Sequence, residues 1–423
     1  MTLQETLDID RRTYLEMASG AVSIPALSSA VGAQSDDAED APSNVTRSRQ
    51  EKFDRLDTYL DENGLEAVWF ADSDAYVWLT GRSNIIDRSS STGVAAVGYD
   101  GSGLTIVVDN DERALVREER FDGGGSDDCH LTPALPDVTI ETFPWYATSL
   151  GDAVAEHSPT PAAAAFDVPG FESLNASALR QPLTAGDIKR YRTLSAETAA
   201  AVEGVCRNAE SGDTEQQVAN ALGCALDQYG IDHPVVLVAG GERARKYRHP
   251  VPRDVELGEY VVVSVVGRRL GEYASCTRTV AFDPPEWLEK RHRIATRIDA
   301  TALVSTRAAA RSDGTAGDVF RAIQAGYREA GLPTEWQEHH QGGAAGYASR
   351  EWVATPGLQT RVTAPMAYAW NPTVKGAKSE GTVLVTDDAI EPLTTTGEWP
   401  TLDAASYVED ATVTRPDILY KNS

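Results

Sequence analysis

The residues best suited to chemistry begin with His249, which lies in the arginine-rich stretch "RKYRHPVPRD". Its imidazole changes charge near neutral pH, so it can pass a proton to a leaving amine. Arg243, Arg245 and Arg248 precede it in a chain that has far more acids than bases. Such a cluster either binds a carboxylate or phosphate or is ordinary solvated charge. The histidine is accordingly a proton-transfer group or a surface residue of a basic loop.

The overall charge restricts the class of partner. The chain has 423 residues, and 38 Lys and Arg against 64 Asp and Glu give a net charge of −26. DNA and RNA are unsuitable partners, because their phosphates need a basic face. Few lysines and many small apolar residues are typical of a halophilic protein, whose surface repulsion is screened by salt. An acidic protein of ordinary surroundings is the alternative.

Several familiar sites are missing from the sequence. The four cysteines form no CxxC pair, which argues against a disulfide framework and a structural zinc site; they are Cys129, Cys206, Cys224 and Cys276. We find no P-loop, HExxH or GxSxG motif and no GxGxxG after a strand. No 18-residue apolar run occurs, so we predict no membrane-spanning segment.

Residues 1–33 have the pattern of a twin-arginine export signal. Arg11-Arg12 precede a weakly apolar run that ends in the small residues Val31–Ala33, a candidate cleavage site. Glu16 interrupts the run, so the alternative is an arm that stays on a cytoplasmic protein. Residues 34–49, rich in Asp, Ser and Ala, are predicted to be an acidic linker.

The elements that must position these residues fall into two domains of mixed α/β (α+β) class. Residues 50–178 alternate helical and strand patterns, with a hairpin turn at Asp100-Gly101. Residues 181–415 open with two amphipathic helices broken at Ser211-Gly212. Strands follow, then helices near 285–310 and 316–330, and strands from Met366 to Leu393.

This order of elements resembles the pita-bread metallopeptidase family of prolidases, Xaa-Pro aminopeptidases, methionine aminopeptidases and creatinases. "LTAGDIKRYRTLSAETAAAVE" followed by "SGDTEQQVANAL" is similar to that family's opening helices, and "AYVWLTG" to an element of the creatinase-type N-terminal domain. The resemblance implies a creatinase-type N-terminal domain, a pita-bread domain and a homodimer.

The family holds two metal ions with two Asp, one His and two Glu, and the ions activate a water. The resemblance places Ser264 of "GEYVVVSVV" and Ser275 of "GEYASCTRT" at the two Asp positions. Asn371 of "AWNPTV" stands at the first Glu position, while His340 and Glu380 keep their ligand types. Three acids have become neutral, so too little negative charge remains for two dications. We expect no dinuclear metal centre and no other cofactor.

Creatinases of this fold cleave a C–N bond without metal, which the resemblance suggests for this chain. The candidate catalytic residues are His249, His340 and Glu380; the last two could hold a water or be a structural remnant. The candidate substrate-binding residues are Arg278, Asn371, Ser264, Ser275 and Tyr347. For Arg278 a structural pairing with a carboxylate is the alternative.

Three hypotheses follow. The first is a creatinase- or prolidase-like hydrolase that is metal-independent and acts on a small molecule or short peptide. The second is a catalytically inactive pita-bread protein that binds a small molecule or a partner. The third is a conventional Xaa-Pro aminopeptidase or dipeptidase. Metal content and turnover would separate them.

Overall fold

The computed structural model describes residues 11–14, 44–87, 89–119 and 138–421. The chain divides into two compact units. One comprises residues 38–189 with 270–272, and the other comprises 190–269 and 273–423 with the N-terminal arm. The division between the two units falls between residues 189 and 190.

The N-terminal unit is a mixed six-stranded sheet of order β4-β3-β2-β1-β5-β6. Its strands are β1 (Ala67–Asp72), β2 (Thr92–Tyr99), β3 (Leu104–Asp109), β4 (Val138–Phe143), β5 (Ala162–Ala164) and β6 (Glu172–Ser173). Its helices are α2 (Asn44–Asn63), α3 (Ser73–Thr80), α4 (Leu150–His157) and the π-helical turn η1 (Leu115–Glu119). The predicted hairpin at Asp100-Gly101 is confirmed, since β2 and β3 pair antiparallel across it.

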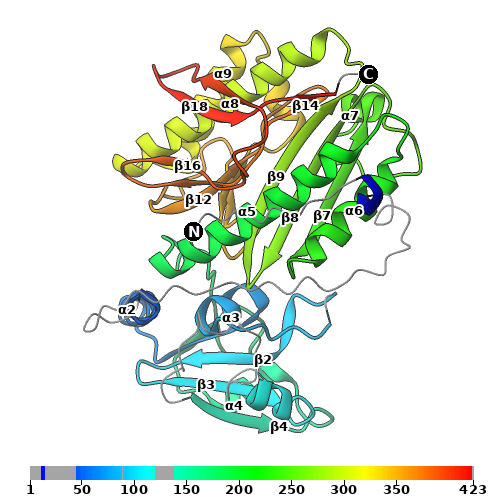
Figure 1. The fold of residues 1–423 in the computed structure, drawn as a ribbon. Coiled ribbons are helices and arrows are strands. Elements are labelled where there is room, and N and C mark those ends of the chain that lie inside the picture. The colour runs from blue at the N-terminus through cyan, green and yellow to red at the C-terminus, as the bar shows by residue number, and fades with distance from the viewer. Residues whose placement is uncertain (1–10, 15–43, 88, 120–137, 422–423) are drawn as a thin grey trace, which may run out of the picture. The chain divides into compact units, whose positions relative to one another are not determined.

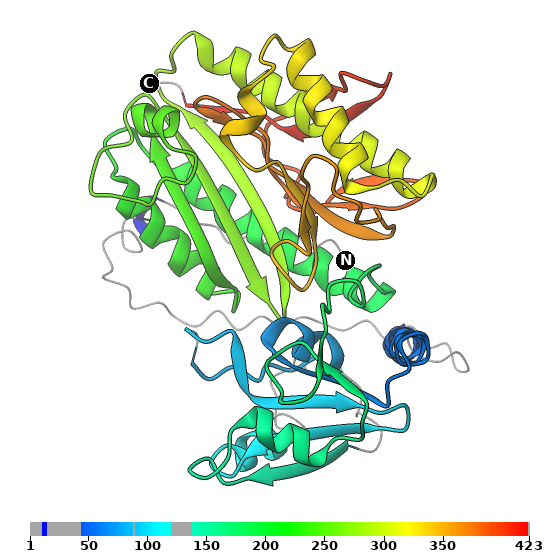
Figure 2. The same cartoon turned by 180° about the vertical axis from the view of Figure 1, so that it is seen from behind.

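The second unit starts with a helix pair packed on a sheet. Helices α5 (Ala185–Asn208) and α6 (Glu215–Asp227) lie against strands β7 (Asp232–Gly240), β8 (Tyr260–Arg269) and β9 (Glu272–Ala281), as Figure 1 shows. The predicted helix break at Ser211-Gly212 is confirmed. The short helix α7 (Gly241–Lys246) and β19 (Leu419–Tyr420) complete this half, and the bare face of the sheet is toward the viewer in Figure 2.

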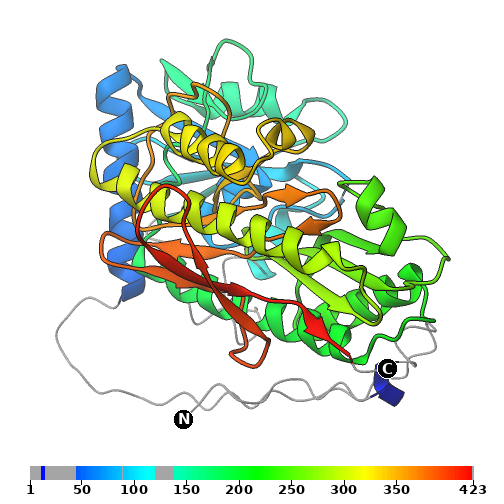
Figure 3. The ribbon, with the colours of Figure 1, turned by 90° about the horizontal axis from the view of Figure 1, so that it is seen from above.

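The other half repeats the plan with helices α8 (Trp287–Arg311) and α9 (Ala316–Glu329), which lie side by side in Figure 3. Their sheet has the order β11-β10-β12-β15-β16. Its strands are β10 (Gly342–Ala345), β11 (Trp352–Val353), β12 (Met366–Trp370), β15 (Val383–Val385) and β16 (Ile390–Pro392). The remaining elements are the 3-10 turn η3 (Glu335–Glu338) and the hairpins β13–β14 (Thr373–Val374, Ala377–Lys378) and β17–β18 (Thr401–Ala405, Thr412–Pro416).

The two half-sheets meet at β9. Cys276 forms an isolated antiparallel bridge with Gly381, and the Thr277 N–H donates to the Glu380 carbonyl at 3.3 Å. The Thr382 N–H donates to the Ser275 carbonyl at 3.0 Å. These bonds hold side chains a hundred residues apart in sequence at a single junction.

The N-terminal arm packs on the second unit. Arg11 binds Asp213 through two N–H groups, at 2.9 and 3.0 Å, and the Tyr14 hydroxyl donates to the same carboxylate at 2.9 Å. Tyr14 is completely buried in the core cluster beneath α5 and α6. The predicted cleavage site at Val31–Ala33 lies outside the described residues.

Two further expectations from the sequence concern the predicted linker and membrane-spanning helices. Residues 44–49 were expected to be linker, but they form the start of α2; the rest of that segment lies outside the described residues. No helix in the described part of the chain is long and apolar enough to span a membrane.

Candidate functional site

Strand alternation separates the polar site from the core. Successive side chains of a strand point to opposite faces. The side chains that pack beneath α5 and α6 are Val261, Val263, Val265, Ala274 and Cys276. Ser264 of β8 and Ser275 and Thr277 of β9 therefore face the other side, where the two half-sheets meet.

A lysine and a glutamate close a hydrogen-bonded ring with these hydroxyls. The Lys378 Nζ donates to Glu380 Oε2 at 2.7 Å and to Ser264 Oγ at 3.2 Å. The Thr277 hydroxyl donates to Glu380 Oε2 at 2.7 Å, and Ser264 Oγ lies 2.7 Å from Thr277 Oγ1. Because the single hydroxyl proton of Thr277 goes to Glu380, Ser264 must donate to Thr277. Both hydroxyl protons of the ring thus have an acceptor, and Lys378 gives two of its three N–H groups to the ring.

An arginine binds the other side of the same glutamate. Arg350 donates to Glu380 Oε1 at 3.0 Å and to Ser275 Oγ at 3.2 Å. Its side chain is 12% exposed and that of Glu380 is 5% exposed. Glu380 therefore lies between two cations, each of which also contacts one of the serines.

The two cations fix the charge of Glu380. Burial alone raises the pKa of its carboxyl, but Lys378 and then Arg350 outweigh burial and lower the pKa to about 2. Glu380 is therefore ionised at every working pH, and its oxygens are occupied by donors. This arrangement makes it an anchor for the cations and a poor general base.

The residues present do not fit two divalent metal ions. Ser264, Ser275 and Asn371 supply no negative charge, and the ammonium and guanidinium groups lie against the one remaining carboxylate. A pair of dications would face two like charges with one carboxylate to offset them. Lys378 and Arg350 instead supply positive charge beside the positions at which the resemblance places metal ligands.

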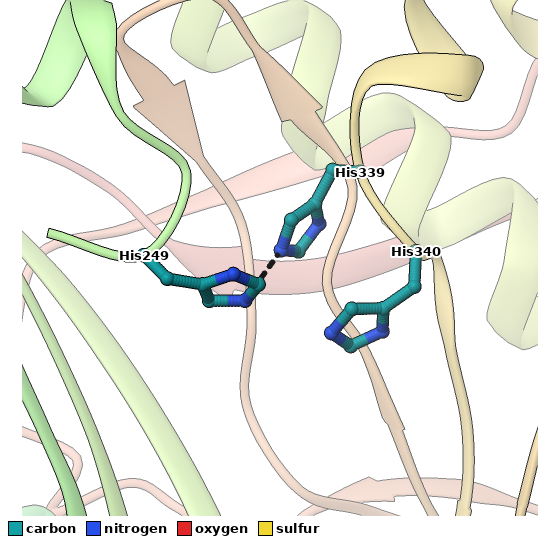
Figure 4. A group of neighbouring side chains, drawn as sticks. All are labelled: His249, His339 and His340. Atoms are coloured by element: carbon teal, nitrogen blue, oxygen red, sulfur yellow. Dashed lines mark hydrogen bonds between the residues drawn. The ribbon is translucent and has the colours of Figure 1, made fainter.

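Three imidazoles gather beside the ring. His249 Nε2 lies 3.1 Å from His339 Nε2, and the ring of His340 stacks on both, with centroids 5.7 and 4.5 Å away (Figure 4). The bond to His339 orients His249 and leaves its Nδ1 as the atom that can exchange a proton with a ligand. The structure thus brings together His249 and His340, two of the candidate catalytic residues, and adds His339 to them.

Buried polar contacts hold the two histidine-bearing loops. Arg248 donates to Glu335 at 2.7 Å, which ties the loop of His249 to the turn η3 before His339. The fully buried Gln341 donates to the His339 carbonyl at 2.6 Å and accepts from Tyr327 at 3.0 Å. Arg248, one of the three arginines of the predicted cluster, is thus paired with a carboxylate and is not a free solvated charge.

All three imidazoles are neutral at neutral pH. Burial, and next the charge of Lys378, lowers the pKa of His339 to about 2. Burial and Arg350 lower the pKa of His340 to about 4, and burial and Lys378 also lower the pKa of His249. A general base must hold a proton near neutral pH, so the low pKa values of His339 and His340 leave His249 as the member of the cluster suited to that role.

The same three histidines are the one group among the described residues whose nitrogens could hold a single metal ion. One nitrogen of each lies within 4.8 Å of the others, and transition metals bind imidazole. Ligation needs all three at about 2.0–2.1 Å from the ion, so the rings would have to converge further. The cations that lower the histidine pKa values also oppose a dication.

Comparison with known proteins now adds to this geometry. Residues 189–387 match the pattern of Metallopeptidase family M24. This part of the chain belongs to metallopeptidase family M24. The match covers β7–β9, β10–β15 and the ring around Glu380, so the family resemblance expected from the sequence is confirmed. No curated protein matches the chain.

Several solved structures share the fold of this chain, and not all of them are named as peptidases. The prolidase from Pyrococcus horikoshii has a TM-score of 0.65 at 18% identity, with 82% of this chain and 98% of that chain covered. The Xaa-Pro dipeptidase from Bacillus anthracis gives 0.64 at 16%, covering 88% and 100%. The N-terminal domain of FACT complex subunit SPT16 from chickpea gives 0.59 at 11%, covering 83% and 97%. The predicted fold is therefore confirmed.

Two predicted substrate-binding residues lie elsewhere in the M24 fold. Arg278 is fully buried on the α5 side of β9 and binds Glu203 at 2.6 Å, so its contacts are structural and leave substrate binding without support. Tyr347 is buried and its hydroxyl accepts from Arg190 at 2.6 Å. Asn371 is buried near β13, and its Oδ1 has no hydrogen-bond partner among the described residues.

Three residues of the site were not predicted from the sequence: Lys378, Arg350 and His339. Lys378 carried a signal, because it stands two residues before Glu380 and is one of only seven lysines. His339 is the neighbour of a residue that was predicted. Arg350 belongs to a loop whose approach to Glu380 depends on tertiary structure, and it carried no usable signal.

Proposed function

We propose that this chain hydrolyses a C–N bond in a small molecule or short peptide without the two-metal centre of family M24. The observation that carries the proposal is the pair of bonds from Lys378 and Arg350 to Glu380. Two fixed cations at this junction offer the electrostatic help that metals give, since they can stabilise negative charge on a carbonyl oxygen.

The proposed proton-transfer group is His249. Its ring is oriented by His339, its pKa is lowered by burial, and Nδ1 is left for a ligand. A neutral imidazole takes a proton from an attacking water and returns it to the leaving nitrogen. His340 stacks on the same ring and supports its orientation.

The conventional alternative has equal support from the family match and the fold. A two-metal Xaa-Pro peptidase would need charged ligands where this chain has Ser264, Ser275 and Asn371. The donor set therefore favours the metal-free hydrolase. A purely binding role is favoured by one observation, the full engagement of Glu380 by its three donors.

The test is turnover in the presence of a chelator. Protein stripped of metal is offered a panel of Xaa-Pro dipeptides and small N-substituted amino acids, and we expect a hydrolysed substrate whose turnover is insensitive to the chelator. His249→Gln should abolish turnover, whereas His157→Gln, in α4 of the other unit, should not. Turnover that requires added metal would establish the conventional peptidase, and no turnover of any compound would favour the binding role.

Export through the twin-arginine pathway, adaptation to high salt and a homodimeric state are further proposals for this protein. Burial of Tyr14 and the pairing of Arg11 with Asp213 favour an arm that stays on the folded protein over a freely exposed export signal. The net charge of −26 supports a protein whose stability increases with salt.

A further inference from the structure

A small pocket adjoins the ring of Lys378 and Glu380. It lies between β7, β8, the loop before His249 and the hairpin β13–β14. Its polar lining consists of Lys378, Ser264, Thr373, Arg248 and Tyr247. Its apolar walls include Leu237, Ala239, Val262, Pro250 and Ala377. Arg248 and Pro250 flank His249, so a ligand in this pocket would lie beside the imidazole cluster.

Hydrogen-bond donors remain available in this pocket. Lys378 has three N–H groups and gives two of them to Glu380 and Ser264. Thr373 pairs directly with Lys378 across the hairpin. Its hydroxyl oxygen is buried and has no hydrogen-bond partner among the described residues. A buried hydroxyl without a partner is costly, so a ligand that accepts its proton would stabilise the site.

The charges around the pocket select the class of ligand. The cations Lys378, Arg350 and Arg248 face the carboxylates Glu380 and Glu335, and all five side chains are at most 20% exposed. One positive charge is left over. The nearby Asp299 and Arg415 pair with each other and add no charge. A monoanion would balance the group, while a neutral ligand would leave a largely buried cation uncompensated.

We propose that this pocket binds a small monocarboxylate, with Lys378, Thr373 and Arg248 as donors. The two oxygens of a carboxylate match the two facing donors of the hairpin, and the apolar walls accept a short aliphatic group. This inference rests on the proposed function at one point only, namely that the bound carboxylate belongs to the substrate. Lys378 would then hold the substrate's carboxylate, Arg350 would be the cation left to stabilise the carbonyl oxygen, and the rest of the substrate would lie beside His249.

The test uses acetate as the probe and the full-length protein in potassium sulfate at constant ionic strength. Acetate should raise the melting temperature in a saturable way, and its neutral isostere acetamide should not. Thr373→Val should weaken acetate binding about tenfold, because a hydrogen bond to a charged group is lost. Thr373→Ser keeps the hydroxyl and should bind normally. Thr279→Val is the matched control, since Thr279 is a buried threonine that also lacks a hydroxyl partner but lies outside the pocket lining.

Two results would overturn the proposal. The first is equal stabilisation by acetate and acetamide, or acetate binding that Thr373→Val leaves unchanged. The second is a chloride effect that depends on Thr373 and exceeds that of acetate, which would identify a halide site. Binding is measured without turnover, so acetate binding in a protein that hydrolyses nothing would support the pocket and count against the proposed function. Metal-free turnover without acetate binding would do the reverse.

Discussion

The Lys378 ammonium lies 2.7 Å from the Glu380 carboxylate, at the junction where the M24 fold joins its two half-sheets. Arg350 binds the other oxygen of the same carboxylate at 3.0 Å. Glu380 keeps the residue type of a metal ligand, yet its partners are two side chains of the protein.

Restoring the acids alone should not restore metal binding. In Ser264→Asp/Ser275→Asp/Asn371→Glu, the cations Lys378 and Arg350 still lie against the ligand positions and can pair with the new carboxylates. Calorimetric titration with Co²⁺ should detect no two-ion site in this triple variant. Addition of Lys378→Ala and Arg350→Ala should produce one. Binding of two ions by the triple variant would contradict the account.

Glu380→Gln should lower the free energy of unfolding by about 3–5 kcal/mol, because it leaves two buried cations without their countercharge. Lys378→Met in the same chain should recover part of the loss. The matched control is Glu391→Gln, since Glu391 pairs with Arg192 at an exposed site and the change should cost under about 1 kcal/mol. Denaturant unfolding gives both values, and similar losses at the two sites would argue against a coupled buried group.

Stability should fall as the pH is lowered, in two windows. His340 has a folded pKa of about 4 against 6.5 in the unfolded chain, so the unfolded state binds more protons between these values. Glu380 has a folded pKa of about 2 against 4.5, so its contribution is lost between about pH 4.5 and 2. Urea unfolding of His340→Gln should show a flatter dependence between pH 6.5 and 4 than the parent. Identical slopes would show that His340 is not held neutral.

Arg278→Met should destabilise the fold by about 3–5 kcal/mol, because Oε1 of the buried Glu203 then loses both of its guanidinium bonds and only the partly exposed Arg207 is left as a countercharge. Glu203→Gln in combination should reduce that loss. Once a substrate is known, the folded fraction of Arg278→Met should turn it over with an unchanged KM. A raised KM at full folding would restore the substrate-binding role predicted from the sequence.

Tyr14→Ala should lower the free energy of unfolding of the full chain by about 3 kcal/mol, since it empties a fully buried aromatic position. Thr13→Ala, at a partly buried neighbour, is the comparison. No difference between the two would indicate that the arm is released from the domain, as an export signal would be.

The fold was accessible from the sequence because its signals are local. Helical periodicity, the Asp100-Gly101 turn and the break at Ser211-Gly212 each depend on a few neighbouring residues, and the structure confirms them. The sequence predicts linker for residues 44–49 because their polar composition is common to linkers and to the first turns of helices.

The site was only partly accessible, because charge balance is a tertiary property. The positions of Ser264 and Ser275 followed from motifs, but nothing near them in sequence showed that Lys378 and Arg350 would contact them. The opposite orientation of Arg278 was open to prediction, since strand alternation places it on the other face from Ser275 and Thr277. Its membership of a familiar motif obscured that simpler inference.

The central claim is tested most directly by measuring transition metals in the native protein, purified in high salt without chelator and without a metal-affinity step. Elemental mass spectrometry of the acid-digested protein should find far less than one equivalent of manganese, cobalt, iron, nickel or zinc per chain. About two equivalents per chain, retained on dialysis, would contradict the replacement of the metal ions by Lys378 and Arg350.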